Sequence, residues 1–316
     1  MQEPEPVFLT SSPGKVLLSG EYFVLWGATA LAFPSLQRQY LTVCDTTDQA
    51  FHRWTTSVGS TEIFSCLIDK ISLHAYEVAG SKASAEFIEK LLWAARSMNP
   101  AIFETSRHFH TELDFQPEWG LGSSSSLIVN ISRFTHTDPW VLHQTISQGS
   151  GYDVACALHE KPLLFSHPEN PRISFPVINY PFADSLYFLP LGFKKDSSRA
   201  IRETAHLRPS TAIIEEASQI SYALTWARTL TEFSELLKSF MHLVKRGLGL
   251  NDDLPAPLND FGGLIKPLGA WGGDLALVIS DVEEDWLRNW FNSRGYARLI
   301  KWQDIIPTFQ NTVLHE

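Results

Sequence analysis

A run of glycines and serines between a strand pattern and a helix pattern is the feature that most constrains this chain. Residues 107–115 alternate between apolar and polar side chains, which is the period of a half-buried strand. One face of that strand carries Phe109, Thr111, Leu113 and Phe115. The sequence PEWGLGSSSS occupies residues 117–126, and an apolar run typical of a helix begins at Leu127. We therefore predict a strand, a loop and a helix in that order.

The loop has the composition of a phosphate-binding segment. Glycines let backbone N–H groups approach a ligand, and a helix N-terminus adds unpaired N–H donors and a partial positive charge. Serine hydroxyls add contacts to phosphate or to a magnesium ion. The predicted nucleotide-binding residues, which form the Gly/Ser loop, are Gly120, Leu121, Gly122, Ser123, Ser124, Ser125 and Ser126. No Gly-Lys-Ser/Thr ends the loop, so it is not a Walker loop. A serine-rich linker that happens to precede a helix is the alternative.

Composition excludes several classes of protein. The chain has 316 residues, enough for two domains, with 44% apolar and 19% charged residues. No apolar run is long enough to span a membrane, and residues 1–6 do not resemble a signal peptide. The formal charge of −10 argues against nucleic-acid binding. The three cysteines, Cys44, Cys66 and Cys156, predict reduced core residues in a cytoplasmic protein.

Near the N-terminus, four short apolar runs are typical of strands. The runs at residues 16–18 and 22–25 predict a hairpin that turns at residues 19–21. The runs at residues 29–33 and 39–43 predict two further strands.

Three segments together resemble one family. The sequence PEWGLGSSSS resembles the central motif of the GHMP kinases, small-molecule kinases that include galactokinase, homoserine kinase, mevalonate kinase and phosphomevalonate kinase. The segment SPGKVLLSGEY at residues 12–22 resembles the first family motif, and KPLGAWGGD at residues 266–274 resembles the third. The three motifs occur in the family order. The third motif and the segment around Asp153 are most similar to the phosphomevalonate kinase and mevalonate kinase branch.

The resemblance assigns a catalytic lysine. In mevalonate kinases the lysine of the first motif lies near the transferred phosphoryl group and the catalytic aspartate, and this role is carried over to Lys15. A surface lysine that follows a turn is the structural alternative.

The resemblance also assigns a catalytic aspartate. Asp138 and Pro139 are typical of a helix start, and the helix should end near Ser147. The following sequence QGSGYD resembles the segment whose aspartate faces the attacking group, and here that aspartate is Asp153. A helix N-cap for residues 154–159 is an alternative role that Asp153 could hold at the same time.

Two positions depart from the family pattern. Mevalonate kinases have a magnesium-binding glutamate eleven residues before the aspartate, and that position is Leu142 here. Metal binding is therefore expected to fall to the hydroxyl of Ser124, the phosphates of ATP and water. Trp271 replaces a glycine in the third motif, where a tryptophan does not readily take a positive φ.

The second half of the chain alternates strand and helix patterns. Strands are predicted at residues 186–191, 275–279 and 297–302, and helices at residues 210–230, 232–246 and 283–293. This segregation indicates an antiparallel sheet covered by helices. A basic loop follows the first of these strands, and a solvated charged loop is its structural alternative. The expected substrate-binding residues are Lys194, Ser198, Arg199, Gly269 and Ala270.

The resemblance implies an α+β, two-domain GHMP kinase fold. Residues 1–184 would form an ATP-binding domain like ribosomal protein S5 domain 2, and residues 185–316 a ferredoxin-like domain. The expected ligands are ATP, Mg²⁺ and a small acceptor, with phosphomevalonate ahead of mevalonate. The alternatives are a sugar or homoserine acceptor, diphosphomevalonate decarboxylase, and a non-catalytic nucleotide-binding relative. The oligomeric state stays open, a homodimer included.

Overall fold

The fold is described from a computed structural model, which covers residues 5–192, 204, 206–251, 254–269 and 274–309. By residue contacts the chain divides into two compact units that are interleaved in the sequence. Unit 1 comprises Met1–Gly14, Gln37–Pro117 and Leu121–His159, and unit 2 comprises Lys15–Leu36, Glu118–Gly120 and Glu160–Glu316. The domain boundary that we expect after residue 184 stays a prediction.

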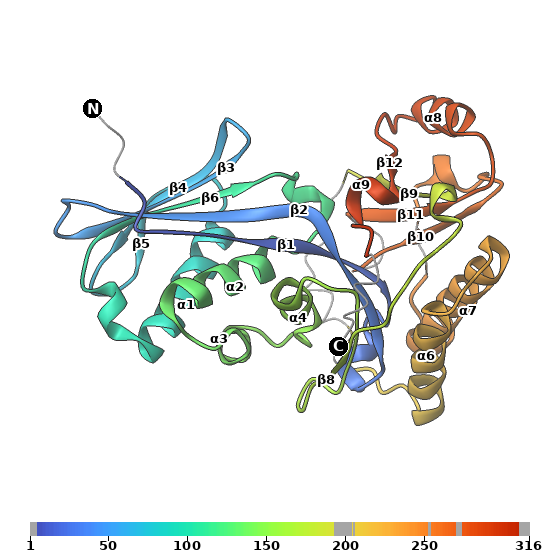
Figure 1. The fold of residues 1–316 in the computed structure, drawn as a ribbon, viewed down its shortest axis with the longest axis horizontal. Helices are drawn as coiled ribbons and strands as arrows, with labels where there is room; N and C mark the ends of the chain where they lie inside the picture. The colour runs from blue at the N-terminus through green and yellow to red at the C-terminus, as the bar shows by residue number, and fades with distance from the viewer. Residues whose placement is uncertain (1–4, 193–203, 205, 252–253, 270–273, 310–316) are drawn as a thin grey trace, which may run out of the picture. The chain divides into compact units, whose positions relative to one another are not determined.

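The larger sheet has eight strands (Figure 1). They are β1 (Phe8–Ser19), β2 (Ala30–Asp45), β3 (Phe51–Val58), β4 (Thr61–Asp69), β5 (Ala75–Ala79), β6 (Arg107–Leu113), β7 (Leu163–Ser166) and β8 (Arg172–Ser174). The strand order is β5-β4-β3-β6-β2-β7-β8, and β1 pairs with β2. The sheet is mixed, because β3 and β6 are parallel while β2 pairs antiparallel with β6 and with β7.

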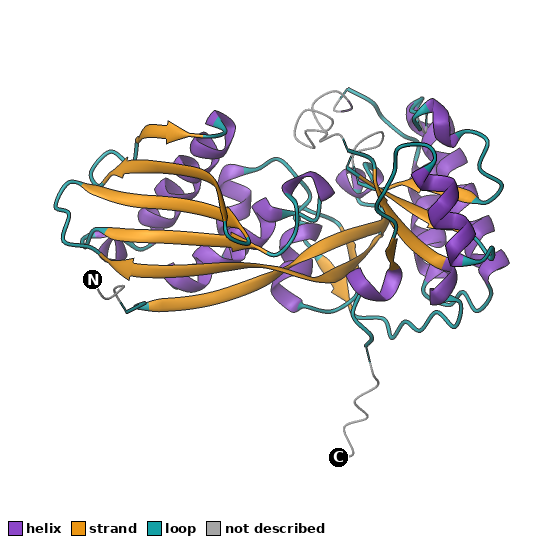
Figure 2. Cartoon of the chain, turned by 90° about the horizontal axis from the view of Figure 1, so that it is seen from above, coloured by secondary structure: helices purple, strands orange, loops and turns teal. Residues whose placement is uncertain are grey.

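Four helices pack on the strands of unit 1. They are α1 (Lys82–Met98), α2 (Ser123–Thr135), α3 (Pro139–Ile146) and α4 (Tyr152–His159). Figure 1 shows them on one face of these strands, and Figure 2 shows the strands side by side with the helices behind them. Their apolar faces and the inward side chains of the strands form one core, in which Trp54 stacks on Phe109 with ring centroids 5.3 Å apart. The alternation predicted for residues 107–115 is confirmed by β6.

The prediction of an N-terminal hairpin is wrong in part. Residues 22–25 are not a strand, because a 3-10 helix, η1 (Phe23–Trp26), begins there. Gly20 and Tyr22 both take positive φ angles, 94° and 61°, which end the extended backbone of β1. The two separate strands predicted at residues 29–33 and 39–43 are one long strand, β2.

Unit 2 contains a second, four-stranded antiparallel sheet in the order β10-β11-β9-β12. Its strands are β9 (Leu186–Pro190), β10 (Leu264–Pro267), β11 (Leu275–Ile279) and β12 (Ile300–Lys301). The helices of this part are α6 (Thr211–Leu224), α7 (Leu230–Leu248), α8 (Glu284–Asn292) and α9 (Trp302–Ile305). Figure 1 shows α8 on one side of this sheet and α6 and α7 on the other.

The short helical turns are η2 (Pro100–Phe103), η3 (Pro117–Trp119), η4 (Ala183–Ser185) and η5 (Ala256–Leu258).

The predicted antiparallel sheet covered by helices is confirmed. One element differs, because the strand predicted at residues 297–302 is reduced to the two residues of β12, and α9 begins at Trp302. Sequence reasoning also missed β10, which leads into the third motif. No described helix is both long and apolar enough to cross a membrane.

The predicted fold class is therefore confirmed: this is a mixed α+β protein with one large mixed sheet and one small antiparallel sheet. The three cysteines form no disulfide among the described residues, and Cys66 and Cys156 are buried. Burial raises the pKa of the Cys66 thiol to about 12, so this thiol stays protonated at neutral pH.

Candidate functional site

The Gly/Ser loop leads into α2, as the sequence predicts, but the helix begins at Ser123 and not at Leu127, so the four serines form its first turn. Gly122 is the residue before the helix and has a left-handed backbone, with φ 83° and ψ 46°. Its carbonyl accepts the N–H groups of Ser125 and Ser126, each at 3.1 Å. The N–H groups of Ser123 and Ser124 therefore stand at the open end of the helix, where the partial positive charge of the helix dipole is concentrated. This end of α2 has the donors that an anionic group requires.

The four serines of the loop do not have equal roles in the fold. The hydroxyl of Ser125 donates to the carbonyl of Gly122 at 2.7 Å, and that of Ser126 donates to the side chain of Gln39 at 2.6 Å. Both residues are buried, as is Leu121. Ser124 is exposed and Ser123 is half-buried. The hydroxyl of Ser124 is thus the one placed best to meet a ligand, while Ser125 and Ser126 hold the loop in shape.

A buried polar network joins α2 to neighbouring segments of unit 1, and it was not predicted from the sequence. Asn130, on α2, donates to the backbone carbonyl of Gln39 at 2.8 Å and accepts from the hydroxyl of Ser12 at 2.8 Å. Arg133, one turn further along α2, donates to the carbonyl of Ser11 at 2.7 Å. Buried and satisfied polar groups of this kind fix a single arrangement of the elements they join. The network therefore joins the first motif, β2 and α2 within unit 1.

The turn that carries Asp153 is held by α3. Gly151 has φ 82°, and a Cβ atom there would lie 2.6 Å from Cη2 of Trp140, so only glycine fits. His143 is buried, and its Nε2 lies 3.1 Å from the carbonyl oxygen of Gly149. These two contacts from α3 fix the glycine-rich turn on both sides of Ser150.

Asp153 itself lies in the first turn of α4, not before it. Its Oδ1 accepts the N–H of the next residue, Val154, at 3.0 Å. Asp153 is therefore not the N-cap of residues 154–159, because α4 already begins at Tyr152. Asp153 is half-buried, so part of the residue is open to solvent.

The departure at Leu142 has a structural reason. This side chain is 0% exposed and belongs to the apolar core of unit 1. A carboxylate at this position would be buried among apolar groups at a high cost in free energy. Among the described residues, no group of three or more histidine, cysteine, aspartate or glutamate side chains could hold a metal ion.

In unit 2, the lysine of the first motif contacts the start of the Gly/Ser loop. The Nζ of Lys15 donates to the carbonyl of Gly120 at 2.7 Å. Asp274 also lies next to Gly120, and a Cβ on Gly120 would lie 2.7 Å from the Cβ of Asp274. Gly120 has φ 64°, so both its backbone angle and its neighbours require glycine. The structure thus brings the end of the third motif and Lys15 to one residue of the central motif.

A buried ion pair joins the first and third motifs in the same unit. The Nζ of Lys266, on β10, contacts the Oε1 of Glu21, and the two side chains are 0% and 1% exposed. Burial raises the pKa of Glu21 and lowers the pKa of Lys266, while the attraction between them opposes both shifts. The ammonium also lies 5.4 Å from the ring centroid of Phe240. Neither residue was assigned a role from the sequence.

Several predicted site residues lie outside the described residues. These are Lys194, Ser198, Arg199 and Ala270, together with Trp271. Gly269 is described and has φ 68°, which suits a tight turn after β10. The roles predicted for all the site residues stay predictions.

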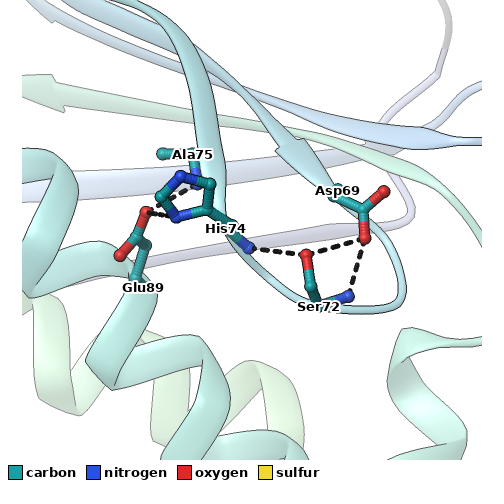
Figure 3. Close-up of polar contacts among 5 residues, drawn as sticks. All are labelled: Asp69, Ser72, His74, Ala75 and Glu89. Carbon is teal, nitrogen blue, oxygen red and sulfur yellow. Dashed lines mark hydrogen bonds and ion pairs between the residues drawn. The ribbon is translucent and has the colours of Figure 1, made fainter.

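A hollow on unit 1 is lined by residues outside the three motifs. It has a volume of about 540 Å³ and is lined by residues of the β4–β5 loop, α1 and the end of α3, among them His74, Glu89 and Trp93. Figure 3 shows that its carboxylate, that of Glu89, is used locally: it accepts the N–H of Ala75 at 2.6 Å and contacts His74. The nearby carboxylate of Asp69 accepts the N–H of Ser72. We therefore assign the hollow no catalytic role.

Comparison with known proteins shows similarity in structure alone. No protein-family model matches the chain, and no curated protein matches it. Among solved structures, it is similar to Streptococcus pneumoniae phosphomevalonate kinase in complex with phosphomevalonate and AMPPNP, with a TM-score of 0.67 at 15% identity over 93% of this chain and 100% of that one. The chain is also similar to Methanococcus jannaschii mevalonate kinase, with a TM-score of 0.66 at 17% identity over 92% of this chain and 96% of that one. A third similar structure is a putative sugar kinase from Campylobacter jejuni, with a TM-score of 0.60 at 12% identity over 94% of each chain. These similarities cover nearly the whole of each chain.

Proposed function

Because this chain has the GHMP kinase fold, we propose that it is an ATP-dependent small-molecule kinase of the mevalonate pathway, with phosphomevalonate favoured over mevalonate as the acceptor. The observation that carries the proposal is the N-terminus of α2. There a left-handed Gly122 opens the helix, the N–H groups of Ser123 and Ser124 face outward, and the hydroxyl of Ser124 is exposed. A serine-rich linker would not require this geometry or a buried network behind it.

The Gly/Ser loop would bind the phosphates of ATP through backbone N–H groups. Ser124 would contact Mg²⁺, which supplies charge neutralisation on the phosphates and keeps most of its ligands as water and phosphate oxygens. The donor set fits this ion, because a hydroxyl and water are hard oxygen ligands. Ser125 and Ser126 act in this proposal by holding the loop, since their hydroxyls are bonded within the protein.

Lys15 and Asp153 are the proposed catalytic residues. Lys15 would offset the negative charge on the γ-phosphoryl group during transfer, a role that suits an ammonium fixed on Gly120. Asp153 would orient the acceptor and accept a proton where the acceptor is a hydroxyl. In the reaction, an acceptor oxygen forms a bond to the γ-phosphorus, the bond from that phosphorus to the β–γ bridging oxygen breaks, and ADP leaves. Catalysis of this type depends mainly on positioning and electrostatics.

The preference for phosphomevalonate is argued from charge. Phosphomevalonate carries a phosphate and a carboxylate, and a protein with a net charge of −10 needs a local group of cations to bind it. The predicted substrate residues Lys194 and Arg199, with Lys195 and Arg202 beside them in the sequence, supply such a group. Mevalonate carries only the carboxylate and needs fewer cations.

A coupled ADP-release screen tests the proposal. The purified protein with Mg·ATP is given phosphomevalonate, mevalonate, homoserine, galactose and a heptose phosphate in parallel, with Asp153→Asn as the control for contaminating kinases. We expect the highest kcat/KM with phosphomevalonate. Turnover of a sugar or homoserine alone would overturn the acceptor assignment. Release of CO₂ from diphosphomevalonate would indicate the decarboxylase, and absence of any turnover with intact ATP binding would indicate a non-catalytic relative.

A further inference from the structure

The proposed mechanism makes no use of His143, the buried histidine that follows Leu142 on α3. The residue is 4% exposed, and a buried imidazole is costly unless its polar atoms are bonded. Its Nε2 lies 3.1 Å from the carbonyl oxygen of Gly149. Because a carbonyl oxygen only accepts hydrogen bonds, Nε2 carries the proton and donates it to Gly149. An apolar side chain could fill the same space but could not make this bond, so the bond is what the histidine contributes.

Further contacts connect α3 to the turn of residues 147–151. The N–H of Ser147 donates to the backbone carbonyl of His143 at 2.9 Å, and the hydroxyl of Ser147 accepts the N–H of Gly149 at 3.0 Å. One turn earlier on α3, Trp140 lies so close to Gly151 that an added Cβ would be 2.6 Å from its ring. Residues three apart on a helix share a face, so Trp140 and His143 support the turn together.

The turn leads directly into the first turn of α4, which carries Asp153. The carbonyl of Gly151 accepts the N–H of Ala155 at 2.9 Å, and the Oδ1 of Asp153 accepts the N–H of Val154 at 3.0 Å. A helix of eight residues is marginal in isolation, and its ends open first. Ala157 anchors the second turn of α4 in the apolar core of unit 1. The first turn, and the carboxylate of Asp153 with it, therefore depends on the support of Gly151.

We propose that His143 is a positioning residue for Asp153. Its hydrogen bond to Gly149 holds the turn of residues 147–151, and that turn fixes the start of α4. The carboxylate of Asp153 is thereby kept in one place before any acceptor binds. Its Oδ2 makes no hydrogen bond with a described residue, so this oxygen is left for the acceptor. The inference rests on the proposed function, in which Asp153 orients the acceptor.

Two variants that differ by one methylene group test the bond. His143→Gln places its amide nitrogen at the position of Nε2, so it can still donate to Gly149. His143→Asn carries the same amide on a shorter side chain, so its nitrogen falls short of that carbonyl. Both variants bury an amide in place of an imidazole, so the general cost of replacing the histidine is common to both. The control is His242→Asn, at an exposed histidine of α7.

The first measurement needs no turnover, so it separates failure of this inference from failure of the proposed function. Hydrogen exchange at the amides of Val154 and Ala155 is followed by mass spectrometry without substrates, with the amides of β6 as the reference for global unfolding. We expect exchange in this turn to be about tenfold faster in His143→Asn, the effect of losing one hydrogen bond, and close to that of the parent in His143→Gln. Equal rates in the parent and His143→Asn, or equal acceleration in both variants, would overturn the inference.

Steady-state kinetics then connects the turn to the reaction. We expect His143→Asn to lower kcat by about tenfold to a hundredfold with little change in the KM for Mg·ATP, because a small displacement of a catalytic group is enough for such a loss. His143→Gln should recover most of the kcat, and His242→Asn should match the parent. A parent-like kcat in His143→Asn, together with faster exchange, would overturn the inference. Absence of turnover in the parent itself would be a failure of the proposed function, and the exchange rates would still decide whether His143 holds the turn that carries Asp153.

Discussion

The ammonium of Lys15 and the carbonyl of Gly120 lie 2.7 Å apart and form a hydrogen bond. This contact joins two segments that are 105 residues apart in the sequence, the first motif and the start of the Gly/Ser loop. It leaves the lysine with a fixed position before any ligand binds. A preorganised charge of this kind needs no rearrangement at the moment of reaction.

Replacing Lys15 by methionine should therefore lower kcat more than it lowers stability. We expect kcat to fall by about 10²–10³-fold, the usual cost of removing one electrostatic stabiliser. The side chain of methionine keeps most of the apolar contact, so the melting temperature should change little. Steady-state kinetics and thermal unfolding measure the two effects. The control is Lys238→Met, at an exposed lysine of α7, and equal kinetics in both variants would remove Lys15 from the site.

Gly120→Ala should lower the stability of the fold more than Gly59→Ala does. Both glycines have a left-handed backbone, but only Gly59 has free space around an added Cβ. Gly59 has φ 54° with nothing within 4 Å of an added Cβ, whereas at Gly120 the added atom meets Asp274. Gly59→Ala should cost about 1–2 kcal/mol for its left-handed angle alone. Gly120→Ala should cost about 1–3 kcal/mol more, and it should raise the KM for ATP. Denaturant unfolding of both variants measures the difference, and equal losses would mean that Asp274 can move aside freely.

Asp153→Asn should remove most of the transfer activity and leave ATP binding intact. Groups that orient or deprotonate an acceptor typically contribute about 10²–10⁴-fold. Asparagine keeps an oxygen that can accept the N–H of Val154, so the start of α4 should survive. Calorimetric titration with Mg·ATP and single-turnover kinetics check the two halves of this prediction. A variant that keeps near-normal turnover would show that Asp153 serves only the helix.

His52 should make the protein less stable at acidic pH. It is 0% exposed, its Nδ1 accepts the N–H of Arg107 at 3.1 Å, and its Nε2 has no hydrogen-bond partner among the described residues. Burial lowers the pKa of His52 from 6.5 to about 4. The unfolded chain therefore binds more protons between these values, so the stability from neutral His52 is full above pH 6.5 and is lost as the pH falls toward 4.

The loss attributable to His52 should reach about 3 kcal/mol across this range. The measurement is the free energy of unfolding at several pH values for the parent protein and for His52→Gln, whose side chain does not titrate. We expect a steeper fall in the parent. Parallel curves for the two proteins would mean that His52 does not become charged on unfolding.

Ser124→Ala and Lys194→Ala should affect different substrates. Ser124 is the exposed hydroxyl of the Gly/Ser loop, so its loss should raise the KM for Mg·ATP more. Lys194 belongs to the predicted acceptor site, so its loss should raise the KM for the acceptor more. Both KM values are measured for both variants. The reverse pattern would mean that the two sites are assigned the wrong way round.

Much of the fold could be predicted because its signals are local. The alternation of residues 107–115, the Asp138 helix start and the glycines before α2 each specify backbone geometry within a few residues, and the structure has the elements they predict. The turn at Tyr22 could not be predicted, since a positive φ at a bulky residue is stabilised by tertiary contacts and not by its own preference.

The buried residues around the candidate site also could not be predicted from the sequence. Asn130 is an ordinary polar residue in an apolar helix pattern, and only the fold shows that it meets Ser12 and Gln39. The partner of Glu21 lies 245 residues away in the sequence. Contacts at this separation leave no spacing pattern, so these buried residues could not be predicted from the sequence.

Product identification by phosphorus NMR tests the central claim most directly. The protein is incubated with Mg·ATP and phosphomevalonate, and the spectrum is followed in time, with Asp153→Asn as the matched control. The account predicts that the γ-phosphate signal of ATP is lost while a diphosphate ester signal of the acceptor grows at the same rate, and that the variant is slower by about 10²–10⁴-fold. Growth of inorganic phosphate alone, or no change in the spectrum with any of the screened acceptors, would contradict it.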